Sequence, residues 1–151
     1  MMPTPKHEGY SGWFEGKTHI LPVRVYYEDT DVSGLVYHAN YLRYMERGRS
    51  DFLRLAGIHH MVMLKENEPL AWTLRSIRID YLRPARLDDA LEVHTRYVEM
   101  GGARLVAGQS VKKAGIELVN ARVEACVITM EGRPRRIPED VRKRLVTFLE
   151  S

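Results

Sequence analysis

The chain has 151 residues, 44% of them hydrophobic and 28% charged, which fits one compact domain with a core of its own. No stretch approaches the roughly 18 apolar residues of a membrane span, and the amino terminus lacks the pattern of a secretion signal, so we expect a cytoplasmic protein. The formal net charge is +3, but acidic and basic residues are interleaved, which argues against a nucleic-acid-binding protein.

The first residues of the chain show no hydrophobic period. Residues 1–19 contain Pro, Gly, His and aromatic side chains, and we interpret them as a loose arm before a single domain at residues 20–151. The segment from Ile20 to Glu28 is short and rich in Val and Tyr, which predicts a strand. Turn-forming residues follow at 29–34, so this strand should enter a loop.

A long helix is predicted after this loop. From Tyr41 onward, apolar or small residues recur every three or four positions, and Gly57 ends the pattern. Gly48 lies on the apolar face, where the missing side chain lets a neighbouring backbone approach closely. The helix should therefore press against a sheet.

The rest of the chain alternates with a period of two, which predicts strands. The first spans about residues 70–82 and ends before Pro84. Residues 91–97 and a segment through about residue 112 flank two glycines and predict a hairpin. The next turn, at residues 113–115, leads into a long strand at 116–130.

A short helix is predicted at the carboxyl end, because Pro138 and two acidic residues make a favourable helix start. The order is thus strand, loop, long helix and four further strands joined largely by tight turns. This order predicts an α+β fold with an antiparallel sheet and the helix on one face. The connections are too short for the crossovers of a parallel sheet.

The densest cluster of functional residue types runs from Tyr26 to Glu46, between the predicted strand and the long helix. A helix amino terminus offers unpaired N–H groups and a positive dipole end, so this segment can polarise a carbonyl and hold a carboxylate nearby. Acyl transfer needs both. The alternative is an Asx-rich turn in which Asp29 or Asp31 only bonds to the loop backbone.

Other chemistries fit the same residues less well. Asp29, Asp31 and Ser33 match the start of an EF-hand loop, but Asn40 stands where that loop needs a bidentate Glu. No Cys or His spacing adds zinc ligands to His38. Ser33, His38 and Asp31 contain the letters of a nucleophilic triad, yet no nucleophile-elbow motif holds them. We therefore expect no metal site.

The loop and helix pattern resembles a known family. It comprises Tyr-Tyr-Glu-Asp-Thr-Asp at residues 26–31, then Gly34, Val36-Tyr37-His38, Asn40-Tyr41, and Glu46 with Arg49. This pattern is similar to the 4-hydroxybenzoyl-CoA thioesterase-like branch of the hotdog superfamily, and within it to the Tol-Pal-associated acyl-CoA thioesterases. The resemblance runs from about Val23 to Pro138.

The resemblance implies a hotdog fold, in which a five-stranded antiparallel sheet wraps around the long helix. The short carboxyl-terminal helix is added to it. It also implies a homodimer or homotetramer whose subunits pair their sheets, with the active site at the interface. The family name implies a place in the cytoplasm, at most peripheral to the inner membrane.

The resemblance further implies hydrolysis of an acyl-CoA to a free acid and CoA. Asp31 would be the catalytic carboxylate, as a general base or as a nucleophile. The backbone N–H near Tyr37 and His38 would polarise the carbonyl, and the His38 side chain would orient water or protonate the thiolate. Gly34, Tyr37 and Tyr41 are the candidate substrate contacts. The alternatives are that His38 only caps the loop and that Tyr41 belongs to the core.

Such a reaction needs no metal or redox cofactor, because a thioester carbonyl is electrophilic and a thiolate leaves readily. Coenzyme A is part of the substrate, and an acyl carrier protein is a further possible carrier of the acyl group. Four arginines are candidates, by their charge and their position near strand ends, for the CoA phosphates: Arg83, Arg86, Arg133 and Arg135.

Three other functions are alternatives to acyl-CoA hydrolysis. A non-catalytic scaffold, bound to an acyl carrier protein or to the envelope machinery, would not need Asp31, Gly34 and His38 together. A hotdog hydratase or dehydratase would carry its Asp and His elsewhere on the fold. An RNA-binding domain would need a basic stripe that the alternating charges do not provide.

Overall fold

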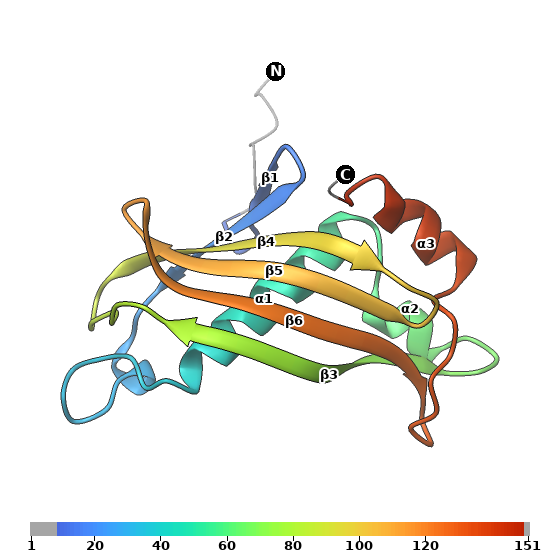
Figure 1. Ribbon diagram of the computed structural model, residues 1–151, viewed down its shortest axis with the longest axis horizontal. Coiled ribbons are helices and arrows are strands. Elements are labelled where there is room, and N and C mark those ends of the chain that lie inside the picture. The colour runs from blue at the N-terminus through green and yellow to red at the C-terminus, as the bar shows by residue number, and fades with distance from the viewer. Residues whose placement is uncertain (1–8, 150–151) are drawn as a thin grey trace.

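An antiparallel sheet curves around one long helix in the computed structural model, which describes residues 9–149 (Figure 1). The strands are β1 (Trp13–Glu15), β2 (Thr18–Arg24), β3 (Leu70–Tyr81), β4 (Ala90–Met100), β5 (Arg104–Lys113) and β6 (Ile116–Thr129). The helices are α1 (Asn40–Leu55), α2 (His60–Leu64) and α3 (Glu139–Val146), and a 3₁₀ turn, η1, spans Tyr27–Asp29. The expected α+β architecture, with a central helix and a short terminal helix, is confirmed.

The strand order across the sheet is β1-β2-β4-β5-β6-β3, and every neighbouring pair is antiparallel. The sheet has six strands rather than the five that the resemblance implies, because β1 forms a hairpin with β2. The predicted hairpin around Gly101 and Gly102 is confirmed as β4 and β5. The long strand β3 forms one edge of the sheet.

We expected a loose arm at residues 1–19, and this expectation is wrong for residues 13–19. These residues form β1, the turn after it and the start of β2. Phe14 holds this segment down, because its ring packs against His19, Phe52 and Phe148 with centroid distances of 4.8–5.4 Å. Aromatic anchors of this kind give no periodic signal in so short a strand. Residues 1–8 lie outside the described residues.

Two further local expectations differ from the structure. The strand predicted through Glu28 ends at Arg24, and η1 follows. The Asp29 carboxylate accepts a hydrogen bond from the Tyr26 backbone N–H at 2.9 Å, so turn chemistry overrides the β propensity of the two tyrosines. The segment after Gly57 forms the one-turn helix α2, which buries Met63.

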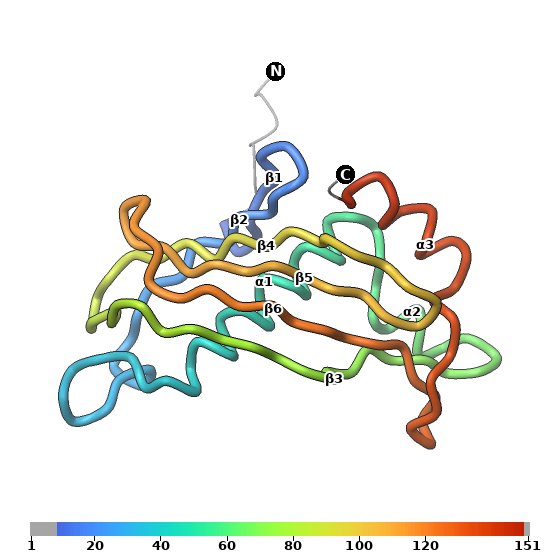
Figure 2. Tube along the Cα trace, in the orientation of Figure 1, coloured from blue at the N-terminus to red at the C-terminus, as the bar shows by residue number. Residues whose placement is uncertain are grey.

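The core lies between the apolar face of α1 and the concave face of the sheet, and Figure 2 shows α1 running across the strands. The tight contact expected at Gly48 is present, although side chains rather than backbone approach it. A Cβ on Gly48 would lie 2.9 Å from Thr95 Oγ1 and from Val93 Cγ1 of β4. Any larger residue at this position would push α1 off the sheet.

A buried polar cluster joins the first strands to α1. Asp51 of α1 is 2% exposed and His19 of β2 is fully buried. Asp51 Oδ2 accepts hydrogen bonds from His19 Nε2 at 2.7 Å and from the Gly12 backbone N–H at 2.8 Å, while Oδ1 pairs with Arg54. This carboxylate therefore fastens two segments of the chain to the helix.

The charge states of this pair follow from its surroundings. Burial lowers the pKa of His19, against the opposing effect of Asp51, so the ring is neutral at pH 7. Burial raises the pKa of Asp51, but the hydrogen bonds from Gly12, His19 and Arg54 outweigh it and leave the pKa below its ordinary value. The cluster is thus an ionised carboxylate that accepts from neutral and charged donors.

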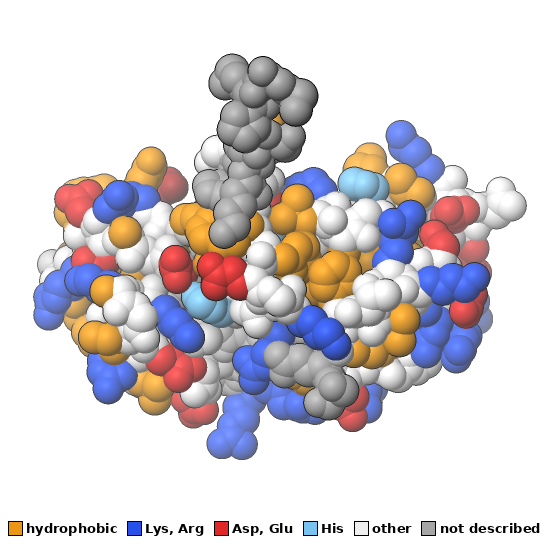
Figure 3. Space-filling model, turned by 90° about the horizontal axis from the view of Figure 1, so that it is seen from above, with side chains coloured by type: hydrophobic (Ala, Val, Ile, Leu, Met, Phe, Trp, Pro, Cys, Tyr) orange, Lys and Arg blue, Asp and Glu red, His pale blue; other side chains and the backbone are white. Residues whose placement is uncertain are grey.

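The outer surface shows no single-sign field on the face that Figure 3 displays, where basic, acidic and apolar side chains are interspersed. Ion pairs cross the convex side of the sheet, such as Arg104 with Glu124 at 2.8 Å and Arg122 with Glu99 at 3.0 Å. Within residues 9–149, none of the helices is long and apolar enough to span a bilayer.

Candidate active site

The loop between β2 and α1 folds back on itself. Thr30 and Val36 form an isolated antiparallel bridge, and the Asp31 N–H donates to the Leu35 carbonyl at 3.0 Å. Gly34 supplies the reversal, because its φ of +77° lies in the left-handed region that side chains disfavour. The loop therefore returns residues 36–38 toward the segment that carries Asp31.

Both ends of the loop are fastened at Asp29. Its carbonyl accepts hydrogen bonds from the Tyr37 N–H at 3.0 Å and from Asn40 Nδ2 at 2.8 Å. Beyond the fold-back, the Val36 N–H donates to the Ala85 carbonyl at 2.9 Å, which ties the loop to the turn before β4. The loop is thus held by backbone hydrogen bonds at each end.

Asp31 is exposed at the tip of this loop. Its Oδ1 accepts hydrogen bonds from the Ser33 backbone N–H at 2.9 Å and from the Ser33 hydroxyl. Its Oδ2 has no hydrogen-bond donor among residues 9–149. The Asx turn that the sequence offered as the alternative to a catalytic role is therefore present. It orients the Asp31 carboxylate and leaves one of its oxygens open.

Ser33 also sets the protonation of this carboxylate. The side-chain hydrogen bond from Ser33, followed by the backbone one, holds the pKa of Asp31 below its ordinary value. Both bonds stabilise the charged form. Asp31 is therefore ionised at neutral pH, which is the state that a base or a nucleophile requires.

Replacing Ser33 with Ala should move the acid limb of activity. If ionised Asp31 is required, the limb of the kcat/KM profile lies below the ordinary carboxylate pKa in the wild type and moves to higher pH in Ser33→Ala, because the largest stabilising hydrogen bond is lost. The measurement is kcat/KM from pH 3 to pH 8. An acid limb at the same pH in both proteins would mean that Asp31 does not control the rate.

His38 lies just before α1 and is exposed. Its ring is tilted against Tyr37 at a centroid distance of 4.4 Å and meets the edge of Tyr81 at 6.3 Å, and its carbonyl accepts a hydrogen bond from the Tyr81 hydroxyl at 3.0 Å. The side chains of His38 and Asp31 share no hydrogen bond in the described chain. His38 is therefore oriented by aromatic neighbours rather than by Asp31.

The start of α1 leaves backbone donors free. Ala39 caps the helix without a side-chain hydrogen bond, and the Tyr37 N–H is already bonded to Asp29. Within residues 9–149, no carbonyl or side chain accepts from the N–H of His38. Of the two N–H groups foreseen from the sequence, the one at His38 is available to a substrate oxygen.

Tyr41, expected as a substrate contact, needs a correction: the structure places its side chain in the core rather than at a binding surface. Its side chain is 2% exposed, and its hydroxyl accepts a hydrogen bond from the Ala85 N–H at 3.0 Å. Tyr37, by contrast, is 47% exposed beside His38. The residues that the loop brings together are therefore Asp31, Gly34, Tyr37 and His38.

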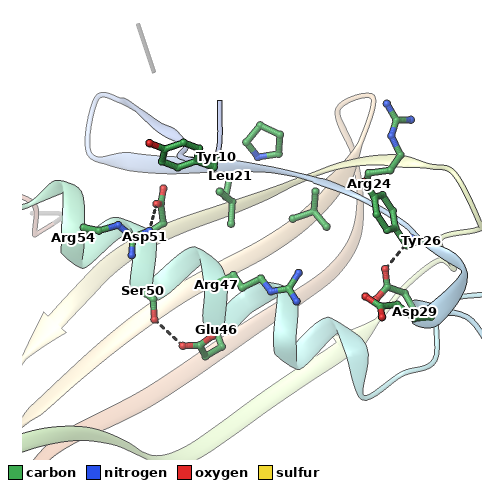
Figure 4. Close-up of a pocket in the computed structure, with 13 residues that line it drawn as sticks. Tyr10, Leu21, Arg24, Tyr26, Asp29, Glu46, Arg47, Ser50, Asp51 and Arg54 are labelled. Atoms are coloured by element: carbon green, nitrogen blue, oxygen red, sulfur yellow. Dashed lines mark hydrogen bonds and ion pairs between the residues drawn. The ribbon is translucent and has the colours of Figure 1, made fainter. Parts of the chain in front are cut away.

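A polar groove of about 470 Å³ lies between β2 and α1 (Figure 4). Arg24, Tyr26 and Asp29 line one end, next to the loop, and Asp51 and Arg54 line the other. Four acidic and three basic side chains line it in all: Glu28, Asp29, Glu46, Asp51, Arg24, Arg47 and Arg54. This mixture favours neither an anion nor a cation.

The four arginines proposed for a phosphate group differ in their surroundings. Arg83 donates to the Glu117 carbonyl, and Arg135 pairs with Glu68 at 2.9 Å. Arg86 is exposed, and its backbone bridges to Leu35 of the active-site loop. Of the four, Arg86 is thus the one that the fold ties to the candidate site. Among residues 9–149, no three His, Cys, Asp or Glu side chains are grouped as metal ligands.

Comparisons with known proteins show the family of the chain. The family described as "Thioesterase superfamily" matches residues 33–120, a range that begins just after Asp31. The acyl-CoA thioesterase YbgC of Haemophilus influenzae is 40% identical over 123 residues, which are 81% of this chain and 90% of the relative. The acyl-CoA thioester hydrolase YbgC of Escherichia coli O6:H1 is 38% identical over 122 residues, which are 80% and 90% of the two chains.

A solved structure extends the likeness. A probable thioesterase from Bartonella henselae shares 42% identity and a TM-score of 0.78, over 80% of this chain and 99% of that one. The relatives are covered nearly in full, and their identity lies well above the range in which only the fold is shared. The chain belongs to the thioesterase superfamily.

Proposed function

We propose that Asp31 is the catalytic carboxylate of an acyl-CoA thioester hydrolase. The observation that carries this proposal is the Asp31 carboxylate itself, ionised, oriented by Ser33 and open at Oδ2, in a loop that returns to the unpaired N–H of His38. The YbgC relatives are acyl-CoA thioesterases, which supports the same reaction for this chain.

Hydrolysis on this site needs one water molecule. The water oxygen attacks the thioester carbonyl carbon while Asp31 takes its proton, and the carbonyl oxygen becomes an oxyanion that accepts from the His38 N–H. Collapse of this intermediate breaks the C–S bond, and the thiolate takes up the proton that Asp31 received, directly or through water or the His38 imidazole, so that Asp31 is ionised again. The products are the free acid and CoA.

The alternative first step has Asp31 attack the carbonyl itself and form an anhydride with the acyl group. Water then hydrolyses the anhydride. A single turnover in ¹⁸O-labelled water shows an anhydride that water opens at its aspartyl carbon, because that attack leaves label in the Asp31 carboxylate. Label only in the released acid means that water attacked an acyl carbon, either of the thioester or of the anhydride. Borohydride trapping then separates these two cases, because it reduces the aspartyl carbonyl of an anhydride and leaves a free carboxylate intact.

A panel of acyl-CoAs tests the reaction. We expect thiol release from short, long or aromatic acyl-CoAs by the wild-type protein, measured with a thiol-reactive dye. A control variant, Asp88→Asn, should release thiol as the wild type does. It changes an exposed aspartate at a φ of +72°, a backbone conformation that asparagine also tolerates. A well-folded protein that releases no thiol from any acyl-CoA would favour the non-catalytic scaffold, and acyl carrier protein loaded with the same acyl groups completes the panel.

A second copy of the chain is part of the proposal. Asp31, Val32 and Tyr37 are exposed in the single chain, with Val32 109% exposed, although hydrolysis of a thioester favours a site screened from bulk water. Strand β3 offers a 12-residue edge that has no partner strand on its outer side within residues 9–149. Pairing two such edges about a twofold axis would cover the site, and sedimentation analysis should give at least a dimer.

Arg86 is proposed as a contact for a CoA phosphate. Arg86→Ala should raise KM for an acyl-CoA about tenfold, because a charge-assisted hydrogen bond is lost, and leave KM for the N-acetylcysteamine thioester of the same acid unchanged. The control is Arg135→Ala, which removes a cation that is paired with Glu68. An equal rise in KM for both thioesters in Arg86→Ala would contradict this role.

A further inference from the structure

A second, mostly apolar cavity of about 190 Å³ lies between α1 and the sheet, away from the active-site loop. Its apolar and aromatic lining comes from α1 and from β3, β4, β5 and β6: Leu53, Trp72, Leu74, Tyr97, Leu105, Ala107, Val123 and Ala125. Glu46 and His60, which are exposed, stand at its rim. Neither the core nor the loop chemistry described above uses this space.

The cavity also carries hydrogen-bond donors without matching acceptors. Arg49 of α1 is half-buried and lines it, and the only hydrogen bond of its guanidinium in the described chain goes to Gln109 Oε1 at 2.9 Å. A guanidinium has five N–H donors. The Nε1–H of Trp72, which also lines the cavity, is buried and has no acceptor among residues 9–149.

Gln109 holds the Arg49 side chain in place. It is 2% exposed, and its Nε2 donates to the Met45 carbonyl and to Thr95 Oγ1, both at 2.8 Å, so its Oε1 is left for Arg49. The guanidinium is therefore fixed by a residue that cannot turn away. Fixed, half-desolvated donors beside an apolar wall favour a ligand that brings an acceptor oxygen.

We propose that this cavity binds the acyl group of the thioester and selects short acyl groups that carry an acceptor oxygen, such as a ketone, for Arg49 and Trp72. The inference rests on the proposed function. The volume sets the size, because an apolar cavity of about 150 Å³ is known to hold benzene. A chain of about six carbons fills a similar space, whereas a long fatty acyl chain does not fit.

The cavity and the catalytic loop that it serves belong to different copies of the chain. The cavity contains Trp72 near the start of β3, whereas the loop contacts Tyr81 at its end through the His38 carbonyl. Nine residues of strand separate Tyr81 from Trp72 by about 30 Å. Along α1, eight residues, or about 12 Å, separate His38 from Glu46 at the rim of the cavity. A six-carbon acyl group is shorter than both distances, so it does not reach this cavity from the loop of its own chain. Antiparallel pairing of two β3 edges places the start of one strand beside the end of the other.

A series of matched thioesters tests the selection. The substrates are hexanoyl-CoA and its 3-oxo, 4-oxo and 5-oxo derivatives, which differ by one acceptor oxygen at different depths, with dodecanoyl-CoA as the long comparison. We expect at least one oxo derivative to exceed hexanoyl-CoA about tenfold or more in kcat/KM, because buried donors reject a substrate that leaves them unpaired. Equal kcat/KM for all of the six-carbon substrates overturns the inference and leaves the hydrolase standing.

Variants of the donors assign the preference to this cavity. Arg49→Met removes the charge at similar length, and Trp72→Phe keeps an aromatic ring but removes the N–H. In each, the ratio of kcat/KM between the preferred oxo substrate and hexanoyl-CoA should fall several-fold. The control is Arg43→Met, an exposed arginine of α1 outside the cavity, which should keep the wild-type ratio. An unchanged ratio in both Arg49→Met and Trp72→Phe overturns the inference.

Mixed oligomers test the position of the cavity relative to the loop. Ala125→Phe fills the cavity of one chain, and Asp31→Asn disables the loop of the other. Unfolding and refolding the two inactive variants together should restore about a quarter of the wild-type activity, because half of the random dimers contain one intact composite site. No recovery from verified mixed dimers places the cavity and the loop of one site in the same chain and overturns the assignment.

The two proposals fail in different ways. If no thioester is hydrolysed, binding to the Asp31→Asn protein still reports on the cavity through calorimetry with 5-oxohexanoyl-CoA and hexanoyl-CoA. The 3-oxo and 4-oxo derivatives are measured in the same way. Stronger binding of at least one oxo compound that Trp72→Phe abolishes supports the cavity without turnover, and equal binding of all four compounds overturns it.

Discussion

Asp31→Asn should lower kcat/KM by about 10²- to 10⁴-fold, the share that a positioned base contributes. The change conserves volume and keeps an oxygen that can accept from Ser33, so the Asx turn survives. What disappears is the negative charge and the basic oxygen at Oδ2. The measurement is steady-state thiol release from the best acyl-CoA of the panel, together with the midpoint of thermal unfolding.

The neighbouring aspartate provides the matched control. Asp29 carries the same carboxylate two residues earlier, but it is committed to the Tyr26 N–H in η1. Asp29→Asn should therefore reduce the rate far less than Asp31→Asn. Comparable turnover by a folded Asp31→Asn protein would remove Asp31 from the mechanism, and loss in Asp29→Asn alone would move the catalytic role to Asp29.

Asp51→Ala should destabilise the fold by about 3 kcal/mol, because two buried donors, His19 Nε2–H and the Gly12 N–H, lose their acceptor together. For a chain of this length the melting temperature should fall by roughly 6–12 °C. The N-terminal hairpin should loosen first, since Gly12 directly precedes β1 and His19 belongs to β2. Calorimetric melting and hydrogen exchange at residues 13–24 measure the two effects.

Arg54→Ala and Asp80→Ala are the controls for this cluster. Arg54 bonds to the same carboxylate but is about half-exposed, so its removal should cost less than about 1 kcal/mol. Asp80 is exposed on β3, and its removal should change stability by less than about 0.5 kcal/mol. A melting temperature for Asp51→Ala that matches either control would show that the cluster is not an anchor.

The same cluster predicts how stability depends on pH. Burial lowers the pKa of His19 in the folded chain, so the unfolded chain binds a proton first as the pH falls through about 6.5. Stability is therefore full above this pH and is lost as the pH drops below it. His19→Gln should flatten this loss between pH 7 and pH 5 in urea unfolding, relative to the wild type.

Much of the fold could be predicted from the sequence, because its strands and long helix bury one face each. The period of two at residues 91–97 and the spacing from Tyr41 to Phe52 follow directly from that burial, whereas Leu55, expected on the same face, is 43% exposed. The hairpin of β1 and β2 could not be read in this way. Its stability comes from Phe14 and the contact of Gly12 with Asp51, which join positions 39 residues apart.

The candidate site was predicted in part for a similar reason. A local turn with Asp31, Gly34 and His38 leaves a compact signature in the sequence. Tyr41 was misplaced because the spacing of a helix does not reveal which tyrosine finds a buried partner such as the Ala85 N–H. Arg49 and Trp72 were not assigned, because their meeting depends on how α1 crosses β3, although Arg49 stood in the family pattern.

The backbone ties of the active-site loop bear on how the protein moves during turnover. Because the loop is bonded to Asp29 at its base and to Ala85 across the fold, the carboxylate and the first turn of α1 form one rigid unit. A catalytic centre of this kind is assembled before substrate arrives and has no lid of its own to close. Release of CoA, rather than closure of the loop, should then pace turnover, so that kcat of the wild-type protein should fall as solvent viscosity rises.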